Sequence, residues 1–363
     1  MKHLTDLTCS RAIFAAWVFA YHVNLQAEYA HALGPLGDVV RRGALGVDGF
    51  FILSGMILAY AHPDLQPSFA QSRPFWGRRL ARIYPVHLAM IVAMALMIGS
   101  AWLLGMHPRD PQRFGLDELL NHLLLVHAWG FSDRWAWNYP SWSISAEWAG
   151  YLLFPYLWAL LRAQNGTGLA VVLPLTLLGV VATHVAAHAQ GLSLTYDGGL
   201  MRLFPEFIAG IAIQPLLNFV PRRINGNVVA LVAGVGFVFA AGCDQEVATI
   251  VALWLMLAGL MHAGVAAKRP VLGRVPGLRW LGEISYSYYM SFALVETLQA
   301  TIWRHFAVSP HDRPALYVFT TTAATLLIAT LTWLLVERPG MRAYAAFARR
   351  RARARVGGYP ARS

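Results

Sequence analysis

RAIFAAWVFAYH, from Arg11 to His22, places two ionisable side chains at the ends of ten uncharged residues. At about 100° per residue, this spacing turns an α-helix to about 20° from its starting direction and climbs ~16 Å. Both side chains therefore lie on one face of a helix, one at a membrane edge and the other near the bilayer midplane. An ionisable group at that depth costs at least ~2.5 kcal/mol, so we expect it to have a partner or a function.

The composition of the whole chain is that of an integral membrane protein. Of its 363 residues, 57% are hydrophobic and 13% are charged, whereas about 25% of residues in soluble domains are charged. About ten apolar windows are long enough to cross ~30 Å of hydrocarbon. They are residues 10–29, 43–61, 82–104, 142–162, 169–188, 200–217, 227–242, 246–265, 281–304 and 315–337. The sequence therefore predicts an all-α, polytopic transmembrane bundle of about ten spans, in which residues 1–340 form one domain and 341–363 a basic cytoplasmic tail.

The distribution of basic residues predicts the orientation of these spans. Lys and Arg are retained on the cytoplasmic side of membrane proteins, and most of the 29 Lys and Arg residues fall in alternate segments that include both chain ends. We therefore expect both termini to be cytoplasmic. The longest connection, residues 105–141, is expected outside, with its apolar piece 119–131 along the interface or re-entrant. The net charge of +11 suits anionic lipid or an anionic cytosolic ligand, and we expect no nucleic-acid partner.

Residues 46–55, GVDGFFILSG, open the second predicted span from the outer side. Asp48 lies at its outer end. Ser54 and Gly55 lie midway, where a small residue lets helices approach closely or lets the backbone meet a ligand. The alternative interpretation is a carboxylate that caps the helix N-terminus, followed by a packing glycine.

Residues 78–85, RRLARIYP, concentrate arginines at the start of the third predicted span. Arg78 and Arg79 are four and three residues before Arg82, so the guanidinium groups cluster on one side of a helix. Such planar groups bind phosphate in a bidentate manner. The alternative is an anchor that contacts lipid headgroups. The density of three arginines in five positions favours the phosphate site.

Residues 140–148, PSWSISAEW, lead from the outer side into the fourth predicted span. Ser143 and Glu147 are four residues apart and so share one helix face. A carboxylate about a turn and a half inside an apolar window needs a cation or a hydrogen-bond donor. The alternative is that Glu147 pairs with an arginine of the outer loop.

Other polar residues in or near apolar windows are assigned no role in chemistry. Arg202 and Glu206, four residues apart, are expected to pair with each other. His122 and His127 lie in the outer connection and are expected to be solvated. Neither of the two cysteines neighbours a metal-ligand pattern, and we expect no metal.

Together, these stretches resemble the acyltransferase-3 family of integral membrane O-acyltransferases, which move an acyl group to a hydroxyl of a cell-surface glycan or a small molecule. The matching pieces occur in the family's order. They are Arg11 with His22 and residues 47–55, 78–82, 141–147, 281–287 and 336–339. The chain departs from the family at Phe292, where many members have a histidine. We also expect it to work without the C-terminal hydrolase-like domain that some members carry.

The resemblance and the predicted topology imply a reaction across the membrane. A cytosolic acyl-CoA, with acetyl as the default acyl group, is the expected donor, and a hydroxyl of a surface glycan or glycolipid is the expected acceptor. His22 is expected to act as general base on that hydroxyl. Glu147 or Asp48 is expected to orient the imidazole and stabilise its charged form. The predicted donor-binding residues are Arg11, Arg78, Arg79 and Arg82. The predicted substrate-binding residues are Trp142, Ser143, Ser145 and Tyr286.

A proton-coupled transporter or flippase of a polar lipid or sugar is the alternative function. It would use His22 and Glu147 as a proton relay. This alternative leaves the arginine cluster as a mere anchor, and no inverted repeat of interrupted segments is evident. The resemblance implies a multi-pass protein of the bacterial inner membrane, and a homo-oligomer is left open.

Overall fold

The computed structural model describes residues 4–105 and 110–356, and these residues form helices and connections without any strand. This confirms the predicted all-α class, and every predicted apolar window overlaps a helix. The long helices are α1 (Thr5–Ala27), α3 (Gly46–Ala61), α4 (Phe69–Leu103), α6 (Trp142–Leu161), α7 (Gly166–Gln190), α8 (Gly199–Leu216), α9 (Gly226–Gly242), α10 (Glu246–Val265), α11 (Leu278–His305) and α12 (Pro314–Thr332). A π-helical turn, Trp333–Glu337, joins α12 to α13 (Arg338–Val356), and two short helices are α2 (Pro35–Arg41) and α5 (Leu116–Leu123).

Within the described residues, five helical segments are long and apolar enough to cross a membrane. They are Gly43–Ala61, Phe69–Leu103, Gly166–Gln190, Glu246–Val265 and Pro314–Arg351. Helices α1, α6, α8 and α11 carry ionisable side chains inside their apolar windows, which lowers the mean hydropathy of those windows. The apolar helices indicate a membrane protein. Ten spans and cytoplasmic termini stay predictions.

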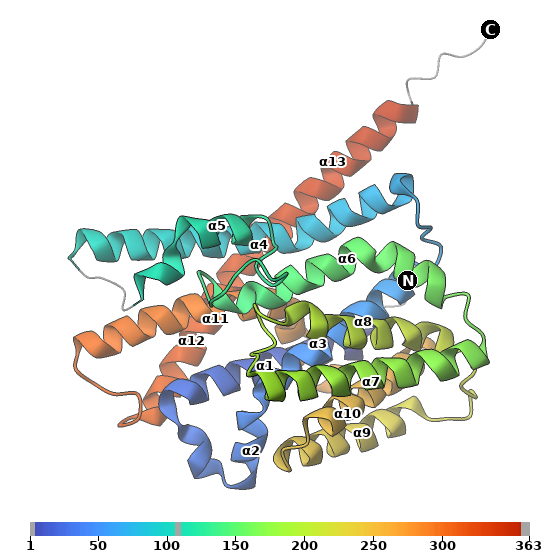
Figure 1. Cartoon of the computed structure of the whole chain (residues 1–363), viewed down its shortest axis with the longest axis horizontal. Coiled ribbons are helices and arrows are strands. Elements are labelled where there is room, and N and C mark those ends of the chain that lie inside the picture. The colour runs from blue at the N-terminus through green and yellow to red at the C-terminus, as the bar shows by residue number, and fades with distance from the viewer. Residues whose placement is uncertain (1–3, 106–109, 357–363) are drawn as a thin grey trace.

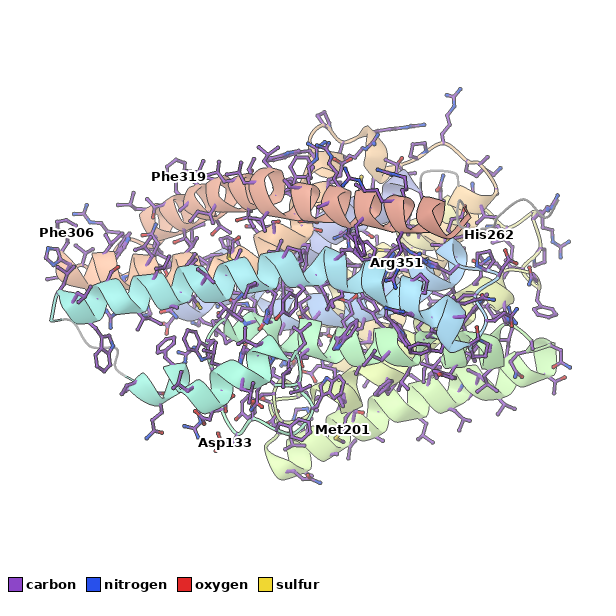
Figure 2. The ribbon with its side chains drawn as sticks, turned by 90° about the horizontal axis from the view of Figure 1, so that it is seen from above. Asp133, Met201, His262, Phe306, Phe319 and Arg351 are labelled. Atoms are coloured by element: carbon purple, nitrogen blue, oxygen red, sulfur yellow. The ribbon has the colours of Figure 1, made fainter. Side chains whose placement is uncertain are left out.

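The long helices run roughly along one axis of the molecule (Figure 1). Helix α1 begins and α13 ends at the same end of the bundle, on the right in Figure 1. Helix α3 packs on α8, α1 on α11, α9 on α10, and α11 on α12. Large apolar side chains point away from the bundle, as Phe319 on α12 does (Figure 2), and Phe319 is 70% exposed. Such a surface suits contact with lipid.

Glycines set the position of α3 in the centre of the bundle. A methyl group added at Gly55 would lie 2.2 Å from the carbonyl oxygen of Phe207 in α8, and one added at Gly210 would lie 2.1 Å from that of Ile52. Because no side chain fits there, the two backbones approach closely, as the sequence predicted for the middle of this span. The side of α3 that carries Ser54 is left to face the interior of the bundle.

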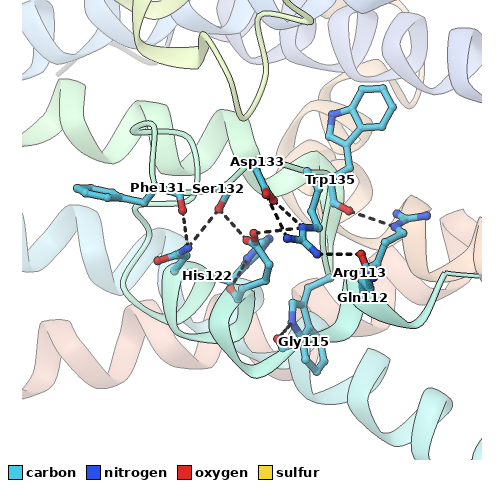
Figure 3. Close-up of polar contacts among 12 residues, drawn as sticks. Gln112, Arg113, Gly115, His122, Phe131, Ser132, Asp133 and Trp135 are labelled. Atoms are coloured by element: carbon cyan, nitrogen blue, oxygen red, sulfur yellow. Dashed lines mark hydrogen bonds and ion pairs between the residues drawn. The ribbon is translucent and has the colours of Figure 1, made fainter.

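Residues 111–141, which follow α4, fold into a compact segment, here called the outer segment because it is predicted to lie outside (Figure 3). Arg113 Nε donates a hydrogen bond to the carbonyl of Trp135, and Ser132 Oγ donates to Glu118 Oε2 at 2.7 Å. Glu118 is 2% exposed, so its carboxylate is held in the segment rather than in solvent. Ala128 N donates to Ser145 Oγ on α6, which ties the segment to the bundle.

The expectation that His122 and His127 are solvated is wrong. Both are buried, and their rings stack with centroids 3.8 Å apart. The cause is that α5 lies on α4, where His87 Nε2 donates to the carbonyl of His122 at 2.8 Å. Burial lowers the pKa of His122 to about 4, so its ring is neutral at pH 7.

Candidate active site

A cavity of about 340 Å³ lies inside the bundle between α1, α3, α4, α6 and α11. Three guanidinium groups line it, from Arg11 on α1 and from Arg79 and Arg82 on α4. Its carboxylate comes from Glu147. Its hydroxyl groups come from Ser54, Ser143, Tyr151, Ser285, Tyr286 and Tyr289. The cavity therefore gathers cations, an acid and hydroxyls in a largely apolar protein.

Six residues that the sequence analysis assigned to donor binding, catalysis or substrate binding meet in this cavity. They are Arg11, Arg79, Arg82, Ser143, Glu147 and Tyr286. The other assigned residues, Arg78, His22, Asp48, Trp142 and Ser145, are not among its lining. Arg78, in the same helix, is exposed. The functional roles of all these residues stay predictions.

Glu147 faces the interior of the bundle and not an arginine of the outer loop. Its Oε1 accepts a hydrogen bond from Ser54 Oγ at 2.5 Å. Tyr151, one turn further along α6, lines the same cavity. Electrostatic interactions link Glu147 to both Arg11 and Arg79. The carboxylate thus has the donor and the cations that a charged group at this depth requires.

The protein provides hydrogen-bond acceptors for only some of the guanidinium donors in the cavity. Arg79 Nε is buried and has no hydrogen-bond partner among the described residues. Arg82 Nη1 lies 3.9 Å from the sulfur of Met341 on α13, a weak acceptor. A buried donor without a partner costs about 1–3 kcal/mol, more when it is charged, so these groups are available to an anionic ligand.

Glu337 is a second buried carboxylate near the arginines. It is 2% exposed, interacts electrostatically with Arg11, and accepts a hydrogen bond from Ser287 Oγ at 2.7 Å. Glu337 lies in residues 336–339, which match the family, but no role was predicted for it. A carboxylate at the end of an apolar window was the signal that could have identified it.

Asp48 forms a buried ion pair with Arg202 across the contact between α3 and α8. Arg202 Nε donates to Oδ1 at 2.9 Å and Nη2 donates to Oδ2 at 2.5 Å, while Asp48 is 0% and Arg202 7% exposed. The predicted pair of Arg202 with Glu206 is therefore wrong, because Asp48 offers both oxygens to the guanidinium fork. Glu206 is buried beside Asp48, and its Oε2 has no hydrogen-bond partner in the described residues.

Two of the predicted substrate-binding residues serve other contacts. Trp142 is buried, with its ring 5.5 Å below the guanidinium of Arg202. Ser145 Oγ donates to the carbonyl of Leu125 at 2.9 Å and so holds the outer segment. Ser143, in contrast, lines the cavity and lies 3.0 Å from the hydroxyl of Tyr289.

His22 has one ring nitrogen fixed by the backbone. Its Nδ1 lies 2.8 Å from the carbonyl oxygen of Val18. A carbonyl oxygen can only accept, so in the neutral ring Nδ1 carries the hydrogen and Nε2 keeps a lone pair. The arrangement therefore presents a basic nitrogen, although His22 does not line the cavity.

An aromatic ring contacts both His22 and a residue that lines the cavity. The ring of Phe292 lies 4.7 Å from that of His22 and 5.7 Å from that of Tyr289, which lines the cavity. Phe292 is 0% exposed. The residue at which this chain departs from the family's histidine is therefore the direct neighbour of His22.

A polar pair that was not predicted from the sequence lies beside His22. The ring of Tyr139 lies 5.7 Å from that of His22, and its hydroxyl donates to Glu296 Oε2 at 2.7 Å. Glu296 is 8% exposed, and its Oε1 has no partner among the residues described. Glu296 is a carboxylate inside an apolar window, residues 281–304, and this was a signal of the same kind as Glu147.

Fold and site together define a helical membrane protein with a polar, arginine-lined cavity in its interior. The chain belongs to the acyltransferase-3 family, because the family model described as an acyltransferase domain matches residues 4–335. It is therefore an enzyme, and the resemblance to the integral membrane O-acyltransferases is confirmed.

Three curated relatives are similar to the chain. Acyltransferase MdmB from Streptomyces mycarofaciens is 30% identical over 80% of this chain and 79% of its own length. Exopolysaccharide production protein ExoZ from Rhizobium meliloti is 28% identical over 86% and 94%. Peptidoglycan O-acetyltransferase OatA from Listeria monocytogenes is 24% identical over 93% of this chain, which spans 56% of that protein. No solved structure matches the chain.

Proposed function

We propose that this enzyme transfers an acyl group, acetyl by default, from cytosolic acyl-CoA to a hydroxyl of a cell-surface or exported glycan. The observation that carries the proposal is the interior cavity in which Arg11, Arg79 and Arg82 meet Glu147. Two of the relatives are named for a peptidoglycan and an exopolysaccharide, which supports a glycan as acceptor. The relatives come from bacteria, which supports a bacterial inner membrane as the location.

The charge of the cavity supports an anionic donor. Its guanidinium groups on Arg11, Arg79 and Arg82 outnumber the nearby carboxylates Glu147 and Glu337. An excess cation in a low-dielectric interior is costly without a counter-ion. Guanidinium groups bind phosphate with two parallel hydrogen bonds, so the phosphates of acyl-CoA are suitable ligands. The pantetheine arm then extends from these phosphates toward Glu147.

The acceptor hydroxyl is proposed to lose its proton to His22. Nε2 of the neutral ring is a free acceptor, and proton transfer to a positioned imidazole contributes roughly 10²–10⁴-fold to rate. Tyr139 and the unpaired oxygen of Glu296 are further groups that can hold a hydroxyl there. Phe292 has to turn aside before the acceptor oxygen beside His22 can reach a carbonyl carbon in the cavity.

Incubation of the purified full-length protein with radiolabelled acetyl-CoA and an extract of surface glycans tests the proposal. We expect loss of thioester and gain of O-acetyl groups on the glycan. Cells with and without the gene should differ in the O-acyl content of the same material. A protein that leaves the thioester intact, yet moves a polar lipid or sugar across vesicles, would instead be the transporter.

A further inference from the structure

The hydroxyl of Ser54 has an unusual partner for a serine within an apolar helix. Such hydroxyls commonly bond to the carbonyl one turn earlier in their own helix, as Ser100 does with Leu96 at 2.8 Å. Ser54 instead donates across the cavity to Glu147 Oε1 at 2.5 Å. The bond directs the hydroxyl hydrogen of Ser54 at a carboxylate oxygen.

The backbone around Ser54 holds this side chain in place. The close contact of Gly55 with Phe207 fixes the rotation of α3 against α8. Ser54, the residue before Gly55, is thereby directed into the cavity. A nucleophile on a rigid helix, with a base at hydrogen-bond distance, is the arrangement that covalent catalysis requires.

The size of the cavity indicates that the two substrates do not occupy it together. A pocket for one drug-sized ligand measures roughly 300–1,000 Å³, and this one measures about 340 Å³. The cavity is therefore at the lower end of the range for one ligand, and the pantetheine arm of a donor would occupy much of it. His22 also does not line the cavity, and the ring of Phe292 contacts both His22 and Tyr289. The acyl group therefore needs a carrier in the cavity between the departure of one substrate and the arrival of the other.

We propose that Ser54 is this carrier and that Glu147 is the base that activates it, an inference that rests on the proposed function. The Ser54 oxygen attacks the thioester carbonyl while Glu147 takes its proton. The new bond joins Oγ to the acyl carbon, the bond from that carbon to sulfur breaks, and the thiolate leaves with the proton from Glu147. In the second half, the acceptor oxygen attacks the Ser54 ester. The new bond joins the acceptor oxygen to the acyl carbon, and the bond from that carbon to Ser54 Oγ breaks. The acceptor proton passes first to His22 and then, by way of Glu147, to the departing Ser54 oxygen, so that His22, Glu147 and Ser54 all return to their starting state.

Trapping of the acyl-enzyme tests this inference. Purified full-length protein is mixed with radiolabelled acetyl-CoA without acceptor, quenched in acid within a second, digested and analysed by mass spectrometry. We expect one acetyl group on the peptide that contains Ser54. The same mixture should exchange label between acetyl-CoA and free CoA. Ser54→Ala should lose both signals, and Glu147→Gln should slow acetylation roughly 10²–10⁴-fold.

Two further variants make the result specific. Ser100→Ala removes a serine whose hydroxyl donates to Leu96 in its own helix, so it should label like the unmodified protein. Ser54→Cys keeps a nucleophile of similar size, and its acetyl group should become removable by neutral hydroxylamine, which cleaves a thioester but not an oxygen ester. Retention of the unfolding temperature shows that each variant is folded.

The outcomes distinguish the carrier from the enzyme activity. If cells with Ser54→Ala acylate their surface glycans as well as cells with the unmodified protein do, the carrier inference is wrong and the proposed function stands. A radiolabel found on His22 or on another residue in place of Ser54 also overturns the carrier inference. If the unmodified protein consumes no acetyl-CoA and the gene changes no glycan, the proposed function fails and the inference fails with it.

Discussion

Removal of the Asp48 carboxylate should destabilise the fold through Arg202. Asp48→Ala leaves the Arg202 guanidinium, which is 7% exposed, without its bidentate partner. Removing one partner of a buried ion pair costs about 3–5 kcal/mol, a large part of the roughly 5–15 kcal/mol that stabilises a typical folded domain. Replacing both partners by apolar residues of similar size is often neutral, so Asp48→Leu with Arg202→Met should restore most of the loss.

A thiol-reactive dye can measure the loss, because the two cysteines differ in exposure. Cys9 is buried and Cys243 is exposed. With Cys243→Ser as the background, dye binding reports only the opening of the bundle around Cys9. Asp38→Ala serves as the matched control, since Asp38 pairs with Arg41 on the surface and its loss should cost less than about 1 kcal/mol.

Two results would refute this reasoning in different ways. If Asp48→Ala unfolds at the temperature of the parent protein, the ion pair does not stabilise the contact between α3 and α8. If the double variant is stable but no longer acylates glycans, Asp48 takes part in the reaction, as its position in the sequence motif predicts. Full activity of a stable double variant assigns Asp48 to structure.

Three other perturbations test the site and the outer segment. His22→Ala should reduce glycan acylation by about a hundredfold or more while the protein still folds; retention of more than a few per cent of activity would assign the ring to packing. Arg79→Gln and Arg82→Gln should each raise the KM for acyl-CoA roughly tenfold, by loss of one charge-assisted contact, with little change for the acceptor, whereas the exposed Arg73→Gln should not. Acidification should loosen α5, as hydrogen exchange of its amides can measure. The unfolded chain binds a proton at His122 below about pH 6.5, whereas the folded chain binds it only near pH 4. As the pH is lowered through this window, the free energy of unfolding decreases, and the loss reaches about 2 kcal/mol at pH 5.

Helices could be predicted from the sequence because hydropathy alone determines where a chain can cross a membrane. Contacts between helices could not. The local spacing of Arg202 and Glu206 favoured an i,i+4 pair, but the approach of α3 to α8 supplies Asp48 with better geometry. His122 and His127 were misjudged for the same reason, since their burial depends on how α5 packs against α4.

The candidate site was predicted in part. The position of Arg11 on its helix face and the clustering of Arg79 and Arg82 at the start of a span placed three cations together, and the structure has them in one cavity. Helical periodicity tells which face a residue occupies but not which neighbour it meets. Hence the partner of Glu147, the Ser54 hydroxyl, was not identified.

The identity of residue 292 bears on how His22 can work. A histidine there would place a second polar ring between His22 and the cavity, and protons or hydroxyls could pass along polar groups. Phenylalanine offers no donor or acceptor and is fully buried against His22. At this position the ring therefore gives a hydroxyl acceptor no hydrogen bond on its way from His22 toward an ester held on Ser54. The departure from the family pattern thus leaves the acceptor proton to His22 without a second imidazole beside it.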